Sequence, residues 1–191
     1  RMLAARALSS VVLIAVTFAA IFVQGPWFAI FVATAALILA AEWTDLCDVA
    51  ISGQTGVTLV AMVAAAVATV GGAQAPEALI VLALGAVAVW LAGGASLRGP
   101  AGWLPFGVVY IGLPAIALIA IAREPMLGRI TIAWMIAAVA VTDIAAYFAG
   151  RAIGGPRLWP SVSPRKTWAG LAGGLAGAAA VGALFTFFLD Q

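Results

Sequence analysis

The stretch that decides the fold is DIAAYFAGRAIGGPRLWPSVSPRKTWAGLAGG, which covers residues 143–174. It holds four of the nine cations of the chain and places the carboxylate of Asp143 inside an apolar run. An ionisable group within a membrane span costs at least about 2.5 kcal/mol to insert, and it therefore marks a functional site by default. We expect the chemistry of this protein to lie in this stretch.

Asp143, Tyr147 and Arg151 recur at every fourth position. A helix through this run brings the three side chains to one face, which drifts only slowly around the helix axis. At a rise of about 1.5 Å per residue, Asp143 lies about 12 Å below Arg151 along that helix. The alternative to a functional site is a structural pairing, in which Asp143 only neutralises Arg151 inside the membrane.

Ser163 and Pro164 have the features of a helix start, because a serine oxygen caps free backbone N–H groups and proline at the first helical position loses no hydrogen bond. We therefore predict a helix that begins at Pro164, with Arg165 and Lys166 in its first turn. Cations at the positive end of a helix are unfavourable unless an anion binds there, so the pattern predicts a phosphate site. The preceding glycine- and proline-rich loop bends the chain so that both helix ends face one pocket. The alternative is that these cations only fix the topology of a membrane span.

Hydrophobic residues make up 65% of the 191 residues, charged residues make up 8%, and the mean hydropathy is +1.19. This composition excludes a soluble globular domain and indicates a polytopic membrane protein. The absence of histidine excludes imidazole catalysis and histidine-ligated metal sites. The net charge of +2 is too small to indicate binding to nucleic acid. The single cysteine, Cys47, is interpreted as an inert side chain rather than a nucleophile.

Apolar runs of about 17 to 25 residues between breakers predict an all-α, polytopic transmembrane helical bundle of about seven spans. The predicted spans are 7–23, 27–46, 57–73, 78–96, 103–122, 130–150 and 168–189. We expect a single integral membrane domain over residues 1–191. Within it, residues 1–100 hold the N-terminal spans and residues 101–191 hold a partial catalytic region.

The cations are distributed unevenly between the two sides of this seven-span arrangement. One side carries Arg1, Arg6, Arg98, Arg151, Arg157, Arg165 and Lys166. The other side carries only Arg123 and Arg129. The positive-inside rule therefore places the first side, and with it the candidate site, in the cytoplasm.

Four glycines follow the candidate site in two overlapping GxxxG pairs, at positions 170, 173, 174 and 177. This pattern lets a membrane helix approach its neighbour closely. We expect it to reflect the packing of the last helix and infer no function from it.

Several motifs in the same region resemble those of a known enzyme family. They are Asp143, Ala146-Tyr147-Phe148, Gly150-Arg151 and Ser163-Pro164-Arg165-Lys166-Thr167-Trp168-Ala169-Gly170. The bacterial phosphatidate cytidylyltransferases, also called CDP-diacylglycerol synthases, have an aspartate, AYF, GR and, after a loop, SPKKTWEG at this point. YIGLP at positions 110–114 and Glu42-Trp43 are also similar to the family. The resemblance covers mainly residues 105–175, and the first spans match only in hydropathy.

The chain departs from the family pattern at two positions. Arg165 stands where the family usually has lysine, which keeps the charge, and Ala169 replaces its usual glutamate, which removes a carboxylate. The family also carries a further C-terminal region, with a K-D pair and an H-G-G-x-x-D-R-x-D segment, that supplies carboxylates for metal. This sequence contains no such segment and begins at Arg1, so we expect it to be part of a longer protein.

The resemblance implies that the phosphate of phosphatidate attacks the α-phosphorus of CTP, expels pyrophosphate and yields CDP-diacylglycerol. It implies catalytic roles for Asp143 and Lys166, with Asp143 either binding Mg²⁺ or orienting Arg151. The residues implied to bind substrate are Tyr147, Arg151, Ser163, Arg165, Lys166 and Thr167. One carboxylate rarely suffices for Mg²⁺, so the other ligands are expected from the missing segment or from substrate phosphates. The implied partners are CTP, phosphatidic acid and the bilayer of the bacterial cytoplasmic membrane, with a homodimer as an open option.

Two other interpretations remain open. In a transporter or a lipid-binding membrane module, the same cations hold an anionic head group without turnover. In a degenerate homologue, the chain only scaffolds other membrane proteins. The observation that separates these from an enzyme is whether the natural chain continues past Gln191 into the acidic segment.

Overall fold

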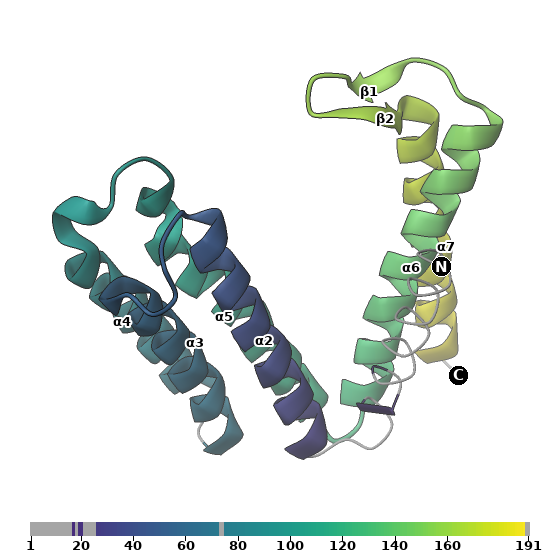
Figure 1. Ribbon diagram of the computed structural model, residues 1–191. Coiled ribbons are helices and arrows are strands. Elements are labelled where there is room, and N and C mark those ends of the chain that lie inside the picture. The colour runs from purple at the N-terminus through teal and green to yellow at the C-terminus, as the bar shows by residue number, and fades with distance from the viewer. Residues whose placement is uncertain (1–16, 18, 21–25, 73–74, 190–191) are drawn as a thin grey trace, which may run out of the picture. The chain divides into compact units, whose positions relative to one another are not determined.

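The computed structural model describes residues 17, 19–20, 26–72 and 75–189 (Figure 1). The chain divides into two compact units, one up to Arg129 and the other from Ile130 onward. Most of the described residues are helical, and several helices are long and apolar enough to cross a membrane. The prediction of an all-α membrane protein is therefore confirmed.

The first unit is a bundle of helices packed around α5. Its described elements are α2 (Pro26–Leu46), α3 (Gln54–Gly72), α4 (Ala75–Gly93), the 3-10 turns η1 (Gly94–Ser96) and η2 (Gly99–Trp103), and α5 (Leu104–Ala122). Helix α5 contacts α2, α3 and α4. Its buried residues, which include Leu104, Val108 and Ile111, recur every three or four positions and so form one continuous apolar stripe.

Five of the described helices have the length and composition of membrane spans. They are Pro26–Leu46, Pro76–Gly93, Gly99–Ala122, Gly128–Ala152 and Trp168–Phe188. These agree within a few residues with five of the predicted spans. The predicted span 57–73 is also helical, although its apolar part, Gln54–Ala68, is shorter, and the predicted span 7–23 lies mostly outside the described residues. The count of seven spans stays a prediction.

The second unit is a helix pair that carries a small hairpin. It contains nearly all of α6 (Gly128–Ala152), then β1 (Arg157–Trp159), β2 (Ser163–Thr167) and α7 (Trp168–Leu189). Helices α6 and α7 lie side by side, and the hairpin joins them at one end (Figure 1). The sequence predicts a loop up to Ser163 and a helix from Pro164, because a short strand pair gives too weak a signal in so few residues.

Glycines on α7 allow this helix to approach α6 closely. A Cβ atom on Gly170 would lie 3.0 Å from the carbonyl oxygen of Ala146, and one on Gly173 would overlap the Cβ atom of Ala149. The other two glycines of the GxxxG pairs approach α6 in the same way. The close packing predicted for the last helix is therefore confirmed.

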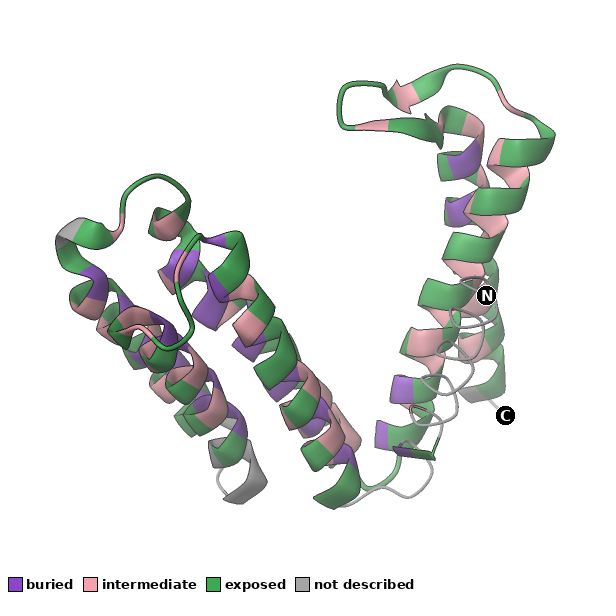
Figure 2. Ribbon diagram, in the orientation of Figure 1, coloured by how far each residue is buried: buried purple, intermediate pink, exposed green. Residues whose placement is uncertain are grey.

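Burial differs sharply between the two units (Figure 2). We compare the share of buried residues in the most apolar part of each span. This share is 44% for Gly99–Ala122 in the first unit. It is only 6% for Gly128–Ala152 and for Trp168–Phe188, which form the helix pair of the second unit. Outside their glycine seam, α6 and α7 expose large apolar side chains such as Ile144 and Leu175. Exposed apolar faces on spanning helices are suited to contact with lipid or with other membrane helices.

Replacing Gly173 by leucine is expected to push α7 away from α6. Gly182 lies on the same helix with open space around it, so Gly182→Leu is the matched control. We expect Gly173→Leu to lower the free energy of unfolding by about 1–3 kcal/mol, the usual cost of overpacking, and Gly182→Leu to change it little. Thermal unfolding in detergent measures both variants. Equal unfolding temperatures would contradict a tight seam between the helices.

Candidate functional site

The chain turns sharply where α6 ends. Gly154 and Gly155 have φ angles of +67° and +93°, in the left-handed region that favours glycine. The carbonyl oxygen of Pro156 then accepts a hydrogen bond from the backbone N–H of Trp168 at 3.1 Å. This bond ties the start of the hairpin to the start of α7, so the hairpin is held over the end of the helix pair (Figure 1).

The two strands of the hairpin pair antiparallel with an irregular register. Arg157 lies opposite Thr167, and Trp159 lies opposite Ser163. The two paired positions are two residues apart in β1 but four residues apart in β2. The extra residues of β2 therefore form a bulge. Pro164 lies within the bulge, where its missing N–H group costs no ladder hydrogen bond.

The predicted helix start at Pro164 is wrong, because α7 begins four residues later, at Trp168. The cap of this helix is Thr167, whose Oγ1 accepts a hydrogen bond from the backbone N–H of Gly170 at 3.1 Å. The segment before Thr167 pairs with β1 instead. This pairing satisfies backbone groups that a first helical turn would leave free, and it outweighs the local helix-start signal.

The later start of α7 changes the local structure around the two adjacent cations. Arg165 and Lys166 lie in β2 and not in the first turn of a helix, so the predicted repulsion within that turn does not arise. Consecutive residues of a regular strand point to opposite faces. Both cations nevertheless line the same cavity, and the bulge is the feature that turns them to one side.

A cavity of about 660 Å³ lies between the end of α6, the hairpin and the start of α7. The residues that sequence analysis assigned to the site all line it, namely Asp143, Tyr147, Arg151, Ser163, Arg165, Lys166 and Thr167. The structure thus brings the predicted residues of two helices and their connection together. Their individual roles remain predictions.

The cavity lining carries an excess of positive charge. It contains the three cations Arg151, Arg165 and Lys166 and one carboxylate, Asp143, which leaves a formal excess of two positive charges. A concave surface with this balance concentrates anions. The two guanidinium groups add donors whose planar geometry matches phosphate oxygens. The site is therefore suited to a ligand with several phosphate charges.

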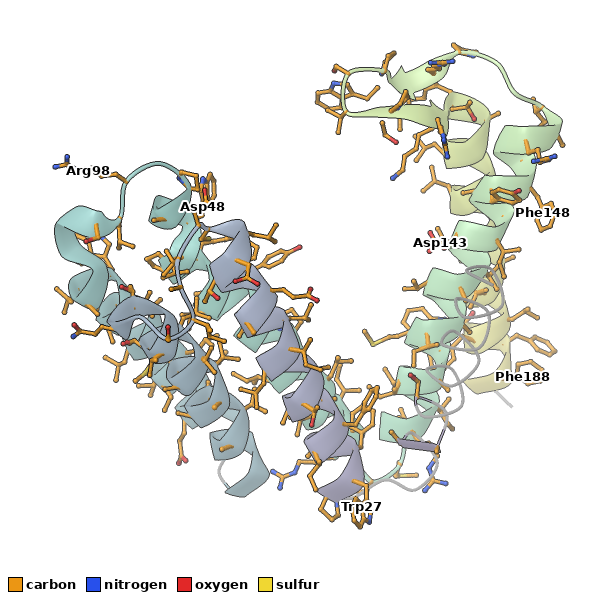
Figure 3. The ribbon with its side chains drawn as sticks, viewed as in Figure 1. Trp27, Asp48, Arg98, Asp143, Phe148 and Phe188 are labelled. Atoms are coloured by element: carbon orange, nitrogen blue, oxygen red, sulfur yellow. The ribbon has the colours of Figure 1, made fainter. Side chains whose placement is uncertain are left out.

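Asp143 faces the cavity without an ionic partner from the described part of the chain. Figure 3 shows its side chain projecting from the flank of α6, below the hairpin in that view. The Nη1 group of Arg151 instead donates to Oη of Tyr147 over 3.5 Å. The structural pairing of Asp143 with Arg151, the alternative left open by the sequence, is not formed in this structure.

Asp143 is the one carboxylate among the described residues that line the cavity. Within the same residues, no group of three or more histidine, cysteine, aspartate or glutamate side chains is placed to hold a metal ion. Mg²⁺ usually takes one or two protein carboxylates and completes its shell with water and substrate phosphates. Asp143 therefore fits as one ligand of such an ion but does not form a site by itself.

The apolar and glycine residues of the lining were missed by sequence reasoning. Leu158 and Leu171 add apolar wall, and Gly150 and Gly170 lie where the two helices meet beneath the hairpin. A Cβ atom on Gly150 would lie 3.0 Å from Oγ1 of Thr167. The two glycines could have been predicted, since they lie close in sequence to residues already assigned to the site. The sequence gives no indication that Leu158 lines the cavity, because its position depends on the register of the hairpin.

Cys47 lies in the first unit, just after α2, and is 2% exposed. Burial raises the pKa of its thiol, and the neighbouring carboxylate of Asp48 raises this pKa further. A raised pKa keeps the thiol protonated, and therefore unreactive, at neutral pH. This environment agrees with the interpretation of Cys47 as an inert side chain.

Comparison with known proteins identifies the family. A model described as the Cytidylyltransferase family matches residues 4–191. The chain belongs to the cytidylyltransferase family. The family resemblance predicted from the motifs is thereby confirmed, and it extends over the first spans as well. No solved structure matches this chain.

Three curated phosphatidate cytidylyltransferases show how far the similarity extends. The one from Brucella suis is 48% identical over 83 residues, which are 44% of this chain and 31% of the relative. The one from Bacillus subtilis is 33% identical over 84 residues, with the same two shares. The one from Pseudomonas aeruginosa is 31% identical over 185 residues, which are 92% of this chain and 67% of the relative. The chain thus matches between about one third and two thirds of the length of these relatives.

The absence of an ion pair between Asp143 and Arg151 predicts how substitutions of the two residues combine in their effect on the free energy of unfolding. Because no ion pair joins it to Arg151, the effects of Asp143→Asn and Arg151→Gln are expected to add in the double variant to within about 0.5 kcal/mol. Thermal unfolding in detergent of the two single variants and the double variant gives the coupling energy. A double variant that regains the stability lost by either single variant would reveal a pair that stabilises the fold.

Proposed function

We propose that this cytidylyltransferase transfers CMP from CTP to phosphatidate, forming CDP-diacylglycerol and pyrophosphate. The observation that carries the proposal is the cavity with Arg151, Arg165 and Lys166 at the end of two helices with the character of membrane spans. Such a cavity is suited to a reaction between the phosphate of a membrane lipid and a nucleoside triphosphate. The names of the three relatives support the choice of substrates.

In the proposed reaction, an oxygen of the phosphatidate phosphate bonds to the α-phosphorus of CTP. The bond from this phosphorus to the bridging oxygen of the β-phosphate breaks, and pyrophosphate leaves. The attacking oxygen is already ionised near neutral pH, so no side chain has to remove a proton from it. The protein then has to supply alignment and neutralisation of charge, which agrees with the three cations that line the cavity.

Each cation of the cavity has a proposed task. Arg165 and Lys166, turned to one side by the bulge, neutralise the nucleotide phosphates, with Lys166 nearest to the transferred group. Arg151 holds a phosphate through paired N–H donors. The Oγ1 atom of Thr167 accepts the N–H of Gly170, which leaves the hydroxyl proton of Thr167 free to donate to a phosphate oxygen.

Asp143 is proposed to supply one oxygen ligand to Mg²⁺. When bound, the ion would supply further neutralisation of phosphate charge. Tyr147 is proposed to bind substrate and to steady Arg151, from which its hydroxyl oxygen accepts a hydrogen bond. Ser163 is proposed to donate to substrate from the wall of the cavity.

Lys166→Ala is expected to slow CDP-diacylglycerol formation on the order of 10²-fold or more, because it removes a charge beside the transferred phosphoryl group. Arg157→Ala is the matched control, since Arg157 is an exposed cation of the same hairpin that does not line the cavity. Turnover of radiolabelled CTP in the complete natural protein measures both. The unfolding temperatures are expected to match that of the unsubstituted protein.

Two results would contradict a catalytic Lys166. One is near-normal turnover by Lys166→Ala, and the other is an equal loss of turnover in Arg157→Ala. If the unsubstituted protein binds phosphatidate vesicles but forms no product from CTP, the lipid-binding module becomes the better interpretation.

We also propose the finer topology of seven spans, with the hairpin and cavity at the cytoplasmic face of the bacterial cytoplasmic membrane. Seven of the nine cations fall on that side, which supports the orientation. Helix α6 has 25 residues and is long enough to cross the bilayer once, so its two ends belong to opposite sides. A homodimer stays part of the proposal, because the exposed apolar faces of α6 and α7 leave surface for a second copy.

Single cysteines at positions 126 and 157 are expected to react with an impermeant maleimide from opposite sides of the membrane. Met126 is 87% exposed in the connection before α6, and Arg157 is exposed after it. A Cys47→Ala background removes the native thiol. The cysteine at 157 should react in inside-out vesicles and the one at 126 in right-side-out cells. Reaction of both from one side would contradict a single crossing by α6.

A further inference from the structure

The hairpin ends in a tip whose side chains the cavity does not use. We define the hairpin tip as residues 159–162. Trp159 is 63% exposed and Val162 is 74% exposed. Neither residue lines the cavity, although the next residues on both sides, Leu158 and Ser163, do so. The hairpin thus leaves two apolar side chains exposed on the second unit.

The direction of the hairpin places this tip at a defined level. Helices α6 and α7 both have the length and composition of membrane spans, and the hairpin connects the end of one to the start of the other. The ends that it connects therefore lie near the same membrane surface. Figure 1 shows the hairpin extending sideways from the helix pair rather than continuing along its axis. A hairpin with this direction runs along the membrane surface, with its tip at the level of the lipid head groups.

The side chains of the hairpin are of the kinds that are found at the level of the lipid head groups. Tryptophan is enriched at membrane interfaces because its ring is apolar while its N–H group stays hydrated. The hairpin also carries the exposed cations Arg157, Arg165 and Lys166, and the sequence contains no aspartate or glutamate between Asp143 and Asp190. Each cation near an anionic membrane surface adds about 1 kcal/mol of attraction.

We propose that the hairpin tip inserts into the boundary between head groups and acyl chains of the adjacent leaflet, and that anionic lipids strengthen the insertion. Trp159 and Val162 provide the apolar contact, and Arg157, the hairpin cation that does not line the cavity, provides the attraction to anionic head groups. The insertion anchors β1 and β2, and so fixes the wall of the cavity at the level of the lipid head groups. This inference concerns the membrane contact and does not depend on the proposed enzymatic activity.

The experiment measures where the tip lies by collision with paramagnetic quenchers. A nitroxide is attached to cysteine in Val162→Cys, in a Cys47→Ala background, and the complete natural protein is placed in vesicles of phosphatidylcholine and phosphatidylglycerol. Oxygen concentrates in the bilayer, whereas a nickel chelate stays in water. A water-soluble nitroxide free in the buffer gives the reference for water, and Leu175→Cys, on the exposed face of α7, gives the reference for lipid.

We expect the label at position 162 to collide more with oxygen than with nickel, at a ratio between those of the two references. A ratio equal to that of the free nitroxide would overturn the proposal, because the tip would then lie in water. A strongly immobilised label that neither quencher reaches would overturn it as well, because the tip would then pack on protein, either another segment or a second copy.

The contribution of charge is tested by repeating the measurement in phosphatidylcholine alone. A lower ratio of oxygen to nickel collisions is expected in the neutral vesicles, because phosphatidylcholine carries no net charge and attracts Arg157 less than phosphatidylglycerol does. The same ratio in both kinds of vesicle would overturn the role given to anionic lipids. Arg157→Gln, which leaves the cavity lining intact, is expected to reduce the difference between the two kinds of vesicle.

Discussion

The close approach of α7 to α6 is the constraint on which the second unit depends. Because Gly170 and Gly173 lack a Cβ atom, the backbone of α7 reaches the backbone and small side chains of α6. The same contact brings Thr167, the cap of α7, against Gly150 near the end of α6. The hairpin leaves from this junction, so the position of Lys166 over the cavity follows from how closely the two helices pack.

The sequence allowed prediction of those features that depend on periodicity and failed where distant pairing decides. The four-residue spacing of Asp143, Tyr147 and Arg151 was sufficient to place them on one face of α6, and all three line the cavity. The helix start at Pro164 was wrong because the chain offers two hydroxyl residues that can cap a helix, Ser163 and Thr167, and the proline after Ser163 favours the first. Pairing with β1 selects the second, and a strand of three residues gives too weak a sequence signal to predict that pairing.

The charges of the site lie at different depths. Arg151 is in the last turn of α6, where a cation is stabilised by the negative end of the helix, and two further cations lie in the exposed hairpin. Asp143 lies two helical turns deeper, at a distance of about 12 Å along the axis. A single phosphate group does not extend over that distance. A ligand that contacts both ends therefore has several phosphate groups or continues from its head group into the membrane.

The bulge that turns Arg165 and Lys166 to one side also links the folding of the hairpin to the binding of an anion in the cavity. Two like charges held beside each other repel, and an anion between them removes the repulsion. An anion that binds the folded hairpin, and not the unfolded segment, stabilises it by mass action. The hairpin has few buried contacts of its own, so it belongs to the part of the chain that opens most easily. Phosphate ligands at the membrane surface would therefore add to the local stability that the helices beneath the hairpin provide.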